Sequence, residues 1–237
     1  PALFNFYYGA VLAEWRRRAP PDITIRFAVD GRLSATDRSF RARDRTPIGD
    51  ATYADDTACL ASSWENIKGR WHAYTDVAGC FGLTVSIRKC RHLVAGRDDT
   101  DGWLLAADAQ RQDSLAPWVR VERVDDFCEL GSTVQADGGW HKEVAARLRS
   151  AGCAWARLKP VLFISPVIGP RMKYRLFDVF ILSRLLYCAE LWRVPWQELR
   201  RLQRFHDRCL RALVGLTRWK MWQRGVSDAR VRELLGA

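Results

Sequence analysis

The sequence lacks the cysteine spacing of a zinc ribbon or a disulfide framework. It has seven cysteines, an odd number, and no Cys-x-x-Cys pair, whereas both kinds of structure depend on closely spaced or paired cysteines. We therefore treat the cysteines as small core residues. A chain with free thiols is typical of a reducing compartment, so we expect an intracellular protein of the nucleus and cytoplasm.

An uninterrupted apolar run is also missing. The longest candidate covers residues 174–192, and four charged residues interrupt it: Arg175, Asp178, Arg184 and Glu190. A membrane-spanning helix needs about 20 predominantly apolar residues, so we expect no membrane partner. The chain begins with proline and not with methionine, and we expect it to be a fragment whose targeting signal lies out of view.

Charge is present in excess but is unevenly spread. The formal net charge is +11, and from Trp140 to the end 20 Lys and Arg stand against 7 Asp and Glu. That half carries +13, so residues 1–139 carry −2. A basic surface of this kind binds polyanions such as nucleic acid. The hydrophobic share of 48% indicates a folded protein of one or two domains.

The most informative short motif is Tyr53-Ala54-Asp55-Asp56, set between apolar flanks. Its pattern predicts a strand, a tight turn and a second strand. Two adjacent carboxylates repel each other unless a cation lies between them. Mg²⁺ prefers carboxylate oxygens and shares its ligand shell with substrate phosphates, which indicates phosphoryl transfer. The alternative is an ordinary solvated turn.

Two later segments narrow the interpretation. Phe81-Gly82-Leu83 leads to Lys89, and Phe127-Cys128-Glu129-Leu130-Gly131 follows further on. In this order, and together with the Tyr-Ala-Asp-Asp turn, the segments resemble the reverse transcriptases of non-LTR (LINE-type) retrotransposons. The resemblance implies an RNA-directed DNA polymerase, a nucleotidyltransferase that uses an RNA template, a DNA primer, deoxynucleoside triphosphates and Mg²⁺, with Mn²⁺ as a substitute.

The same resemblance implies a role for individual residues. Asp55 and Asp56 would bind the metal ions, and Lys89 would act as an acid toward the pyrophosphate leaving group. The primer and the nucleotide would be bound by Asn5, Tyr53, Leu130 and Gly131. The resembled enzymes need a further aspartate on a strand upstream of this chain, so we expect the isolated fragment to have little or no polymerase activity.

Periodicity predicts a mixed first half. We expect helices over residues 1–18 and from a capping box at Ser62–Glu65 to Cys80. Strands are expected over residues 23–29, ending at an Asp30-Gly31 turn, and over residues 85–94. A strand over residues 118–124 is expected to pair with residues 127–134 as a hairpin.

The sequence pattern of the second half, from residue 140 onward, predicts a helical bundle. Amphipathic patterns predict helices over residues 140–158, 170–192, 195–213 and 227–235, the second of them apolar nearly all round and buried. We expect the outward arginines of the first and third of these helices to bind nucleic acid; they are Arg147, Arg149, Arg200, Arg201, Arg204 and Arg208. The alternative is a solvated charged face. The predicted fold is α+β, with a partial polymerase palm over residues 1–134 and a helical thumb over residues 135–237.

The sequence also allows other interpretations. The chain can be a non-catalytic, nucleic-acid-binding remnant of a retroelement polymerase, in which only the basic helices act. An unrelated metal-dependent nuclease that uses Asp55 and Asp56 is disfavoured, because the sequence has no further Asp, Glu or His spaced to complete its metal site. His206 and Cys209 are one helical turn apart, but two ligands make no closed zinc site, so we expect them to pack. Base stacking is left open for Trp219 and Trp222.

Overall fold

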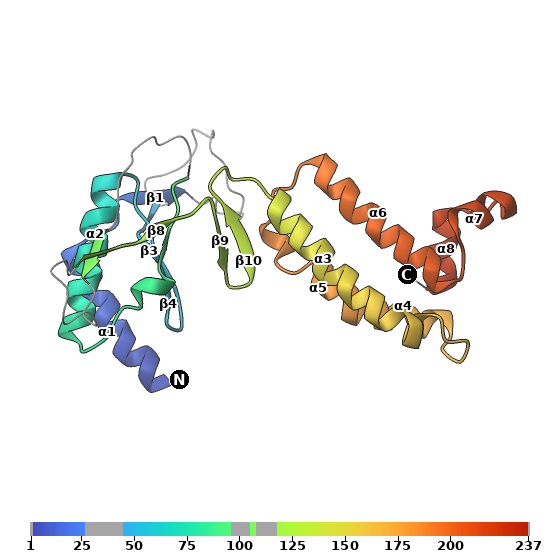
Figure 1. Cartoon of the computed structure of the whole chain (residues 1–237), viewed down its shortest axis with the longest axis horizontal. Coiled ribbons are helices and arrows are strands. Elements are labelled where there is room, and N and C mark those ends of the chain that lie inside the picture. The colour runs from blue at the N-terminus through green and yellow to red at the C-terminus, as the bar shows by residue number, and fades with distance from the viewer. Residues whose placement is uncertain (1, 27–44, 96–104, 108–117, 237) are drawn as a thin grey trace. The chain divides into compact units, whose positions relative to one another are not determined.

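The computed structural model describes residues 2–26, 45–95, 105–107 and 118–236. The chain divides into two compact units, which we describe separately. The first unit comprises Pro1–His92 and Asp98–Arg123, and the second comprises Leu93–Arg97 and Val124–Ala237. Helices and small two-stranded sheets make up the described residues (Figure 1). The expected mixture of helix and strand is therefore confirmed.

Two packed helices form the core of the first unit. Helix α1 (Ala2–Arg18) lies against α2 (Trp64–Cys80), as both helical patterns predict. Their shared core consists of buried apolar side chains: Tyr8, Val11, Leu12, Trp15 and Val77. The cap of α2 differs by one position from the expected one, because the Ser63 hydroxyl accepts a hydrogen bond from the backbone N–H of Asn66 while Ser62 donates to Asp22.

The first unit also contains short strands that pair two by two. Antiparallel pairs join β1 (Ile23–Arg26) to β2 (Arg45–Ile48), β3 (Asp50–Tyr53) to β4 (Asp56–Cys59), and β6 (Leu105–Ala107) to β7 (Trp118–Arg120). A short parallel pair joins β5 (Arg91–His92) to β8 (Glu122–Arg123). The predicted strand over residues 23–29 is formed as far as Arg26. Its remaining residues and the Asp30-Gly31 turn lie outside the described residues.

Two strand predictions are wrong. Residues 85–94 form a 3₁₀ turn at Ile87–Lys89, in which the Lys89 N–H donates to the Ser86 carbonyl, followed only by the short strand β5. Residues 118–124 do not pair with residues 127–134. The hairpin is instead closed within one segment, by β9 (Asp126–Glu129) and β10 (Ser132–Gln135). A two-residue turn between strands makes this local pairing possible.

The second unit is a set of helices to which this hairpin is attached. Helix α3 (His141–Leu158) continues past Pro160 as a π-turn (Lys159–Phe163). Then follow α4 (Pro170–Phe177), a second π-turn η4 (Asp178–Leu182), α5 (Ser183–Leu185) and a 3₁₀ turn (Ala189–Leu191). The last helices are α6 (Trp196–Leu213), α7 (Arg218–Arg224) and α8 (Asp228–Leu235).

The core of the second unit joins one face of each long helix. Val144, Phe163, Phe177, Phe205 and Val231 are representative members and are almost fully buried. Helix α3 packs on α6 and on the η4–α5 segment, and α8 closes against α4 and α6 (Figure 1). The Cys209 thiol is completely buried, and burial raises its pKa to about 12. Since zinc binds the thiolate, this fits the predicted packing role.

The structure corrects the helix over residues 170–192. It is not buried on all sides, because Val179 is 63% exposed and Phe180 is 40% exposed. It also stops after Leu185 and not at Trp192. Leu199 on α6 is 44% exposed, and the sequence patterns did not predict α7. The hairpin residues 126–135 belong to the same compact unit as the later helices.

No helix among the described residues combines the length and the apolar character that crossing a bilayer requires.

Candidate functional site

The Asp-Asp motif lies at the tip of the β3–β4 hairpin. Tyr53 pairs with Asp56, so that Ala54 and Asp55 form the two-residue turn. Both aspartates are exposed, and Tyr53 is 66% exposed. This is the strand, turn and strand that the sequence predicts, and it places two carboxylates at adjacent positions on a tight turn.

The turn contains a strained residue. Ala54 has a φ angle of 54°, in the left-handed region that glycine adopts without cost. Two-residue hairpins of this type usually have glycine at the first central position. Retained strain of this kind occurs often at functional sites, where it holds neighbouring side chains in place.

We expect Ala54→Gly to stabilise the hairpin. Relief of a strain of about 1 kcal/mol outweighs the greater unfolded-state freedom of glycine, for a net gain of about 0.5 kcal/mol. Hydrogen exchange of the hairpin amides measures the change. Ala51→Gly, on the regular part of β3, is the matched control and should instead reduce protection. Equal losses in both variants would show that the turn is unstrained.

A hydroxyl network fixes the base of the hairpin. The Tyr8 hydroxyl of α1 lies 2.6 Å from Thr57 Oγ1 on β4 and 2.7 Å from the Tyr74 hydroxyl on α2. Burial and the hydrogen bond between the Tyr8 and Tyr74 hydroxyls raise the pKa of Tyr74 well above its usual value. The Tyr74 phenol therefore stays neutral, and both helices hold the strand that follows the aspartates.

A buried arginine anchors the start of the hairpin. Arg70 on α2 is 3% exposed and donates to the carbonyl oxygens of Ala19 and Gly49, the latter at 3.0 Å. Its guanidinium lies 4.9 Å from the centroid of the Trp15 ring and 4.0 Å from Asp50. Arg70 therefore joins the end of α1 to the residue that precedes β3.

Asp50, the first residue of β3, completes this anchor. Arg16 donates to both of its carboxylate oxygens, at 3.0 Å and 2.6 Å, and only 3% of the Asp50 side chain is exposed. Gly49 is required next to it, because a Cβ there would lie 2.4 Å from the Arg70 guanidinium. This anchor was not predicted from the sequence. Its signal was an arginine on the otherwise apolar face of the helix over residues 64–80.

The number of carboxylate ligands limits which metal ion the Asp55-Asp56 turn can bind. Among the described residues, no three His, Cys, Asp or Glu side chains are grouped so that they could bind a metal ion. Two exposed carboxylates fit a Mg²⁺ ion that keeps several waters and shares substrate phosphates, because such ions commonly take only one or two protein carboxylates. They do not form a closed site on their own.

The other residues assigned to catalysis lie on separate elements. Asn5 is exposed on α1, and Lys89 is exposed in the 3₁₀ turn. Within the part of the chain that the structure describes, no hydrogen bond or ion pair joins either residue to Asp55 or Asp56. Their roles stay predictions.

The β9–β10 hairpin has a turn with two left-handed residues. Leu130 has a φ angle of 48° and Gly131 one of 81°, as type I′ hairpin turns require. Leu130 is 48% exposed. The tip is held to the helices of its own unit: Tyr187 donates to the Leu130 carbonyl at 2.9 Å, and Arg147 donates to the Gly131 carbonyl. The predicted primer-binding residues thus have a defined conformation.

A buried carboxylate supports the same contact. Glu143 on α3 is fully buried and accepts hydrogen bonds from the Thr133 N–H at 2.7 Å and from Arg147 at 2.6 Å. Burial opposes ionisation, but these two hydrogen bonds outweigh it and lower the pKa of Glu143. Arg147, assigned to nucleic acid from the sequence, therefore also positions the hairpin.

We expect Glu143→Gln to destabilise the second unit by about 2 kcal/mol at neutral pH, since charge-assisted hydrogen bonds are lost. A lowered pKa means that the ionised form stabilises the fold above the usual value near 4.5, and that this contribution disappears as the pH falls through the lower folded value. Urea unfolding at pH 7 and at acid pH measures the effect, with exposed Glu190→Gln as the control. A pH-independent difference would contradict it.

The arginine face of α6 is largely without acidic partners. Arg200 lies 5.1 Å from the Trp196 ring centroid and Arg208 lies 5.5 Å from that of Phe205. Arg201 is paired with Glu198 at 2.8 Å. Within the described residues, Arg204 has no ion-pair partner. Arg149 is exposed on α3.

The remaining acidic residues nearby are already paired. Asp207 bonds Arg232 at 3.4 Å, and Asp228 bonds Arg211 at 3.1 Å. Neither of them bonds Arg200, Arg204 or Arg208 of α6, which remain available to an anionic partner. Trp219 and Trp222 on α7 are 62% and 82% exposed.

No known protein family, curated protein or solved structure matches this chain.

Proposed function

We propose that this chain is part of an RNA-directed DNA polymerase of the non-LTR retrotransposon type, with palm residues over 1–134 and a thumb over 135–237. The observation that carries the proposal is the exposed Asp55-Asp56 pair on a strained hairpin turn. Two helices and the buried Arg70 anchor hold this hairpin. A solvated loop needs no such support.

In this role the chain's own residues bind and orient the metal, the nucleotide and the nucleic-acid strands. Asp55 and Asp56 hold divalent metal, which when bound stabilises the charge that develops on the nucleotide phosphates. Tyr53 packs against the primer end, and Asn5 and Lys89 contact the nucleotide. The turn at Leu130 and Gly131 lies along the primer backbone, and Arg149 with the arginines of α6 binds phosphates of the RNA template and DNA primer. Such an enzyme acts in the nucleus and cytoplasm.

The second candidate is a non-catalytic remnant that binds nucleic acid through its basic helices alone. It is favoured by the absence, in the described ranges, of a third metal ligand beside the two aspartates. The two candidates share the arginine face and differ in whether the Asp-Asp turn binds metal.

Mn²⁺ binding separates them, because its unpaired electrons broaden the NMR signals of nearby nuclei. With a deoxynucleoside triphosphate present, we expect broadening of the backbone amides of residues 54–57 in the parent chain and in Asp76→Asn, an exposed control on α2. The double variant Asp55→Asn with Asp56→Asn should lose it. If the double variant is broadened as strongly as the parent, the enzyme proposal fails and the remnant stands.

A further inference from the structure

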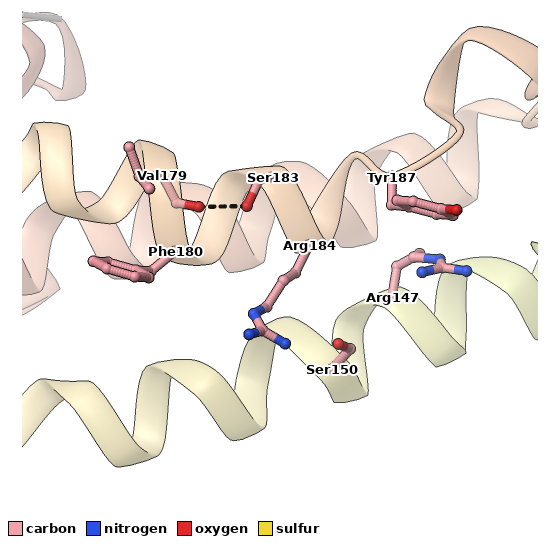
Figure 2. Close-up of a pocket in the computed structure, with 7 residues that line it drawn as sticks. All are labelled: Arg147, Ser150, Val179, Phe180, Ser183, Arg184 and Tyr187. Carbon is pink, nitrogen blue, oxygen red and sulfur yellow. Dashed lines mark hydrogen bonds between the residues drawn. The ribbon is translucent and has the colours of Figure 1, made fainter. Parts of the chain in front are cut away.

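A groove runs between α3 and the η4–α5 segment of the second unit (Figure 2). It has a volume of about 410 Å³, within the range of small-ligand sites. Arg147 and Ser150 line it from α3, and Phe180, Arg184 and Tyr187 line it from the opposite side. We call it the α3–α5 groove. Of these five residues, only Arg147 has a function predicted from the sequence.

The backbone beside the α3–α5 groove is irregular. The π-turn η4 contains Val179 and Phe180, and the Ser183 hydroxyl donates to the Val179 carbonyl. Isolated π-turns are rare and occur often at functional sites, because the widened turn redirects side chains. Here it lies where Phe180, 40% exposed, and Val179, 63% exposed, face away from the core.

Backbone strain is concentrated at one end of the groove. Within the described residues, the non-glycine residues with positive φ are Ala54, Leu130 and Cys188. Leu130 and Cys188 lie at this end of the groove, because Tyr187, the residue before Cys188, donates a hydrogen bond to the Leu130 carbonyl. Such residues are strained, and strain of this kind clusters where a structure holds a ligand. The tip of the β9–β10 hairpin therefore contacts the groove through Tyr187.

The two arginines of the groove differ in their contacts. Arg147 bonds Glu143 and the Gly131 carbonyl, and its guanidinium lies 4.7 Å from the Tyr187 ring centroid. Arg184 is exposed, and in the described part of the chain it has no acidic partner. Its side chain extends across the groove toward α3 (Figure 2). Among the described residues, the groove thus contains one cation without an acidic partner, which lies between the exposed rings of Phe180 and Tyr187 (Figure 2).

We propose that the α3–α5 groove binds an unpaired nucleotide of a nucleic-acid strand, with the phosphate at Arg184 and the base against Phe180. The proposal rests on the proposed function and extends it to a single-stranded segment beside the Leu130-Gly131 turn. A cation next to an exposed aromatic ring is the usual combination in single-strand binding, since one contacts the backbone and the other stacks a base. Bases inside a duplex are already stacked and leave such a ring without a partner.

Fluorescence anisotropy with a short uridine-only RNA and with a blunt RNA duplex tests the groove. Arg184→Gln should weaken single-strand binding about tenfold and lower its salt slope by about 0.7. Phe180→Ala should weaken it about tenfold without changing the salt slope, because stacking is not ionic. Duplex binding should change little in both. Exposed Arg193→Gln and Val167→Ala, outside the groove, are the matched controls.

The outcomes separate the two proposals. If the parent chain binds the single strand but both groove variants match their controls, the groove proposal is wrong and the proposed function is untouched. The groove proposal is also wrong if both variants weaken duplex and single strand equally. If the parent chain binds neither RNA at low salt, the groove proposal and the proposed function fail together.

Discussion

Replacing Arg70 by methionine is expected to destabilise the first unit by about 3–5 kcal/mol, the cost of breaking a buried, hydrogen-bonded charge. The carbonyl oxygens of Ala19 and Gly49 lose their donor, and the buried Asp50 keeps only Arg16. Hydrogen exchange resolved by peptide measures this, because peptides of α1 and α2 should lose protection while those of α3 and α6 should not.

Lys68→Met is the matched control, since Lys68 is an exposed cation on the same helix. Arg70→Lys should recover only a small part of the loss, because an ammonium group cannot reproduce the planar contacts of the guanidinium with two carbonyls and the Trp15 ring. If Arg70→Met loses less than about 1 kcal/mol, Arg70 does not anchor the hairpin.

Changing Arg200, Arg201, Arg204 and Arg208 together to glutamine is expected to weaken duplex binding about a hundredfold and to lower the salt slope by about 3 to 4, because each phosphate contact contributes about 0.9. Three of the four have no acidic partner among the described residues, so their removal should cost the fold little. Titrations at several salt concentrations measure both quantities.

The control removes the same number of charges from exposed arginines elsewhere in the second unit: Arg157, Arg175, Arg193 and Arg230. A general effect of net charge would lower the salt slope equally in the two quadruple variants. That result would remove the physical basis for assigning α6 to nucleic acid, and would favour an ordinary solvated face.

Local patterns predicted the parts of the fold that local forces determine. Apolar spacing of three and four residues found α1, α2, α3 and α6, since each buries one face. The Tyr53–Asp56 turn was predicted because apolar strands flank it. The pairing of residues 118–124 was predicted wrongly, because the partner of a short strand is chosen by tertiary contacts that alternation does not encode.

The site was predictable only in part for a related reason. Asp55 and Asp56 are adjacent in sequence, so their exposure on one turn could be inferred. The anchor of Arg70 with Gly49 and Asp50 joins residues far apart along the chain, and no periodic pattern specifies it. The contact of Tyr187 with Leu130 is of the same kind. Nor did the apolar pattern of residues 170–192 indicate the π-turn that exposes Phe180.

Metal-directed cleavage tests the polymerase assignment most directly. Fe²⁺ can occupy carboxylate Mg²⁺ sites and, with ascorbate and peroxide, generates radicals that cut nucleic acid close by. On a primed RNA template we predict cleavage confined to the neighbourhood of the primer 3′ end with the parent chain and Asp76→Asn, and none with Asp55→Asn and Asp56→Asn combined. Cleavage spread evenly along the template, or unchanged in the double variant, would contradict the account.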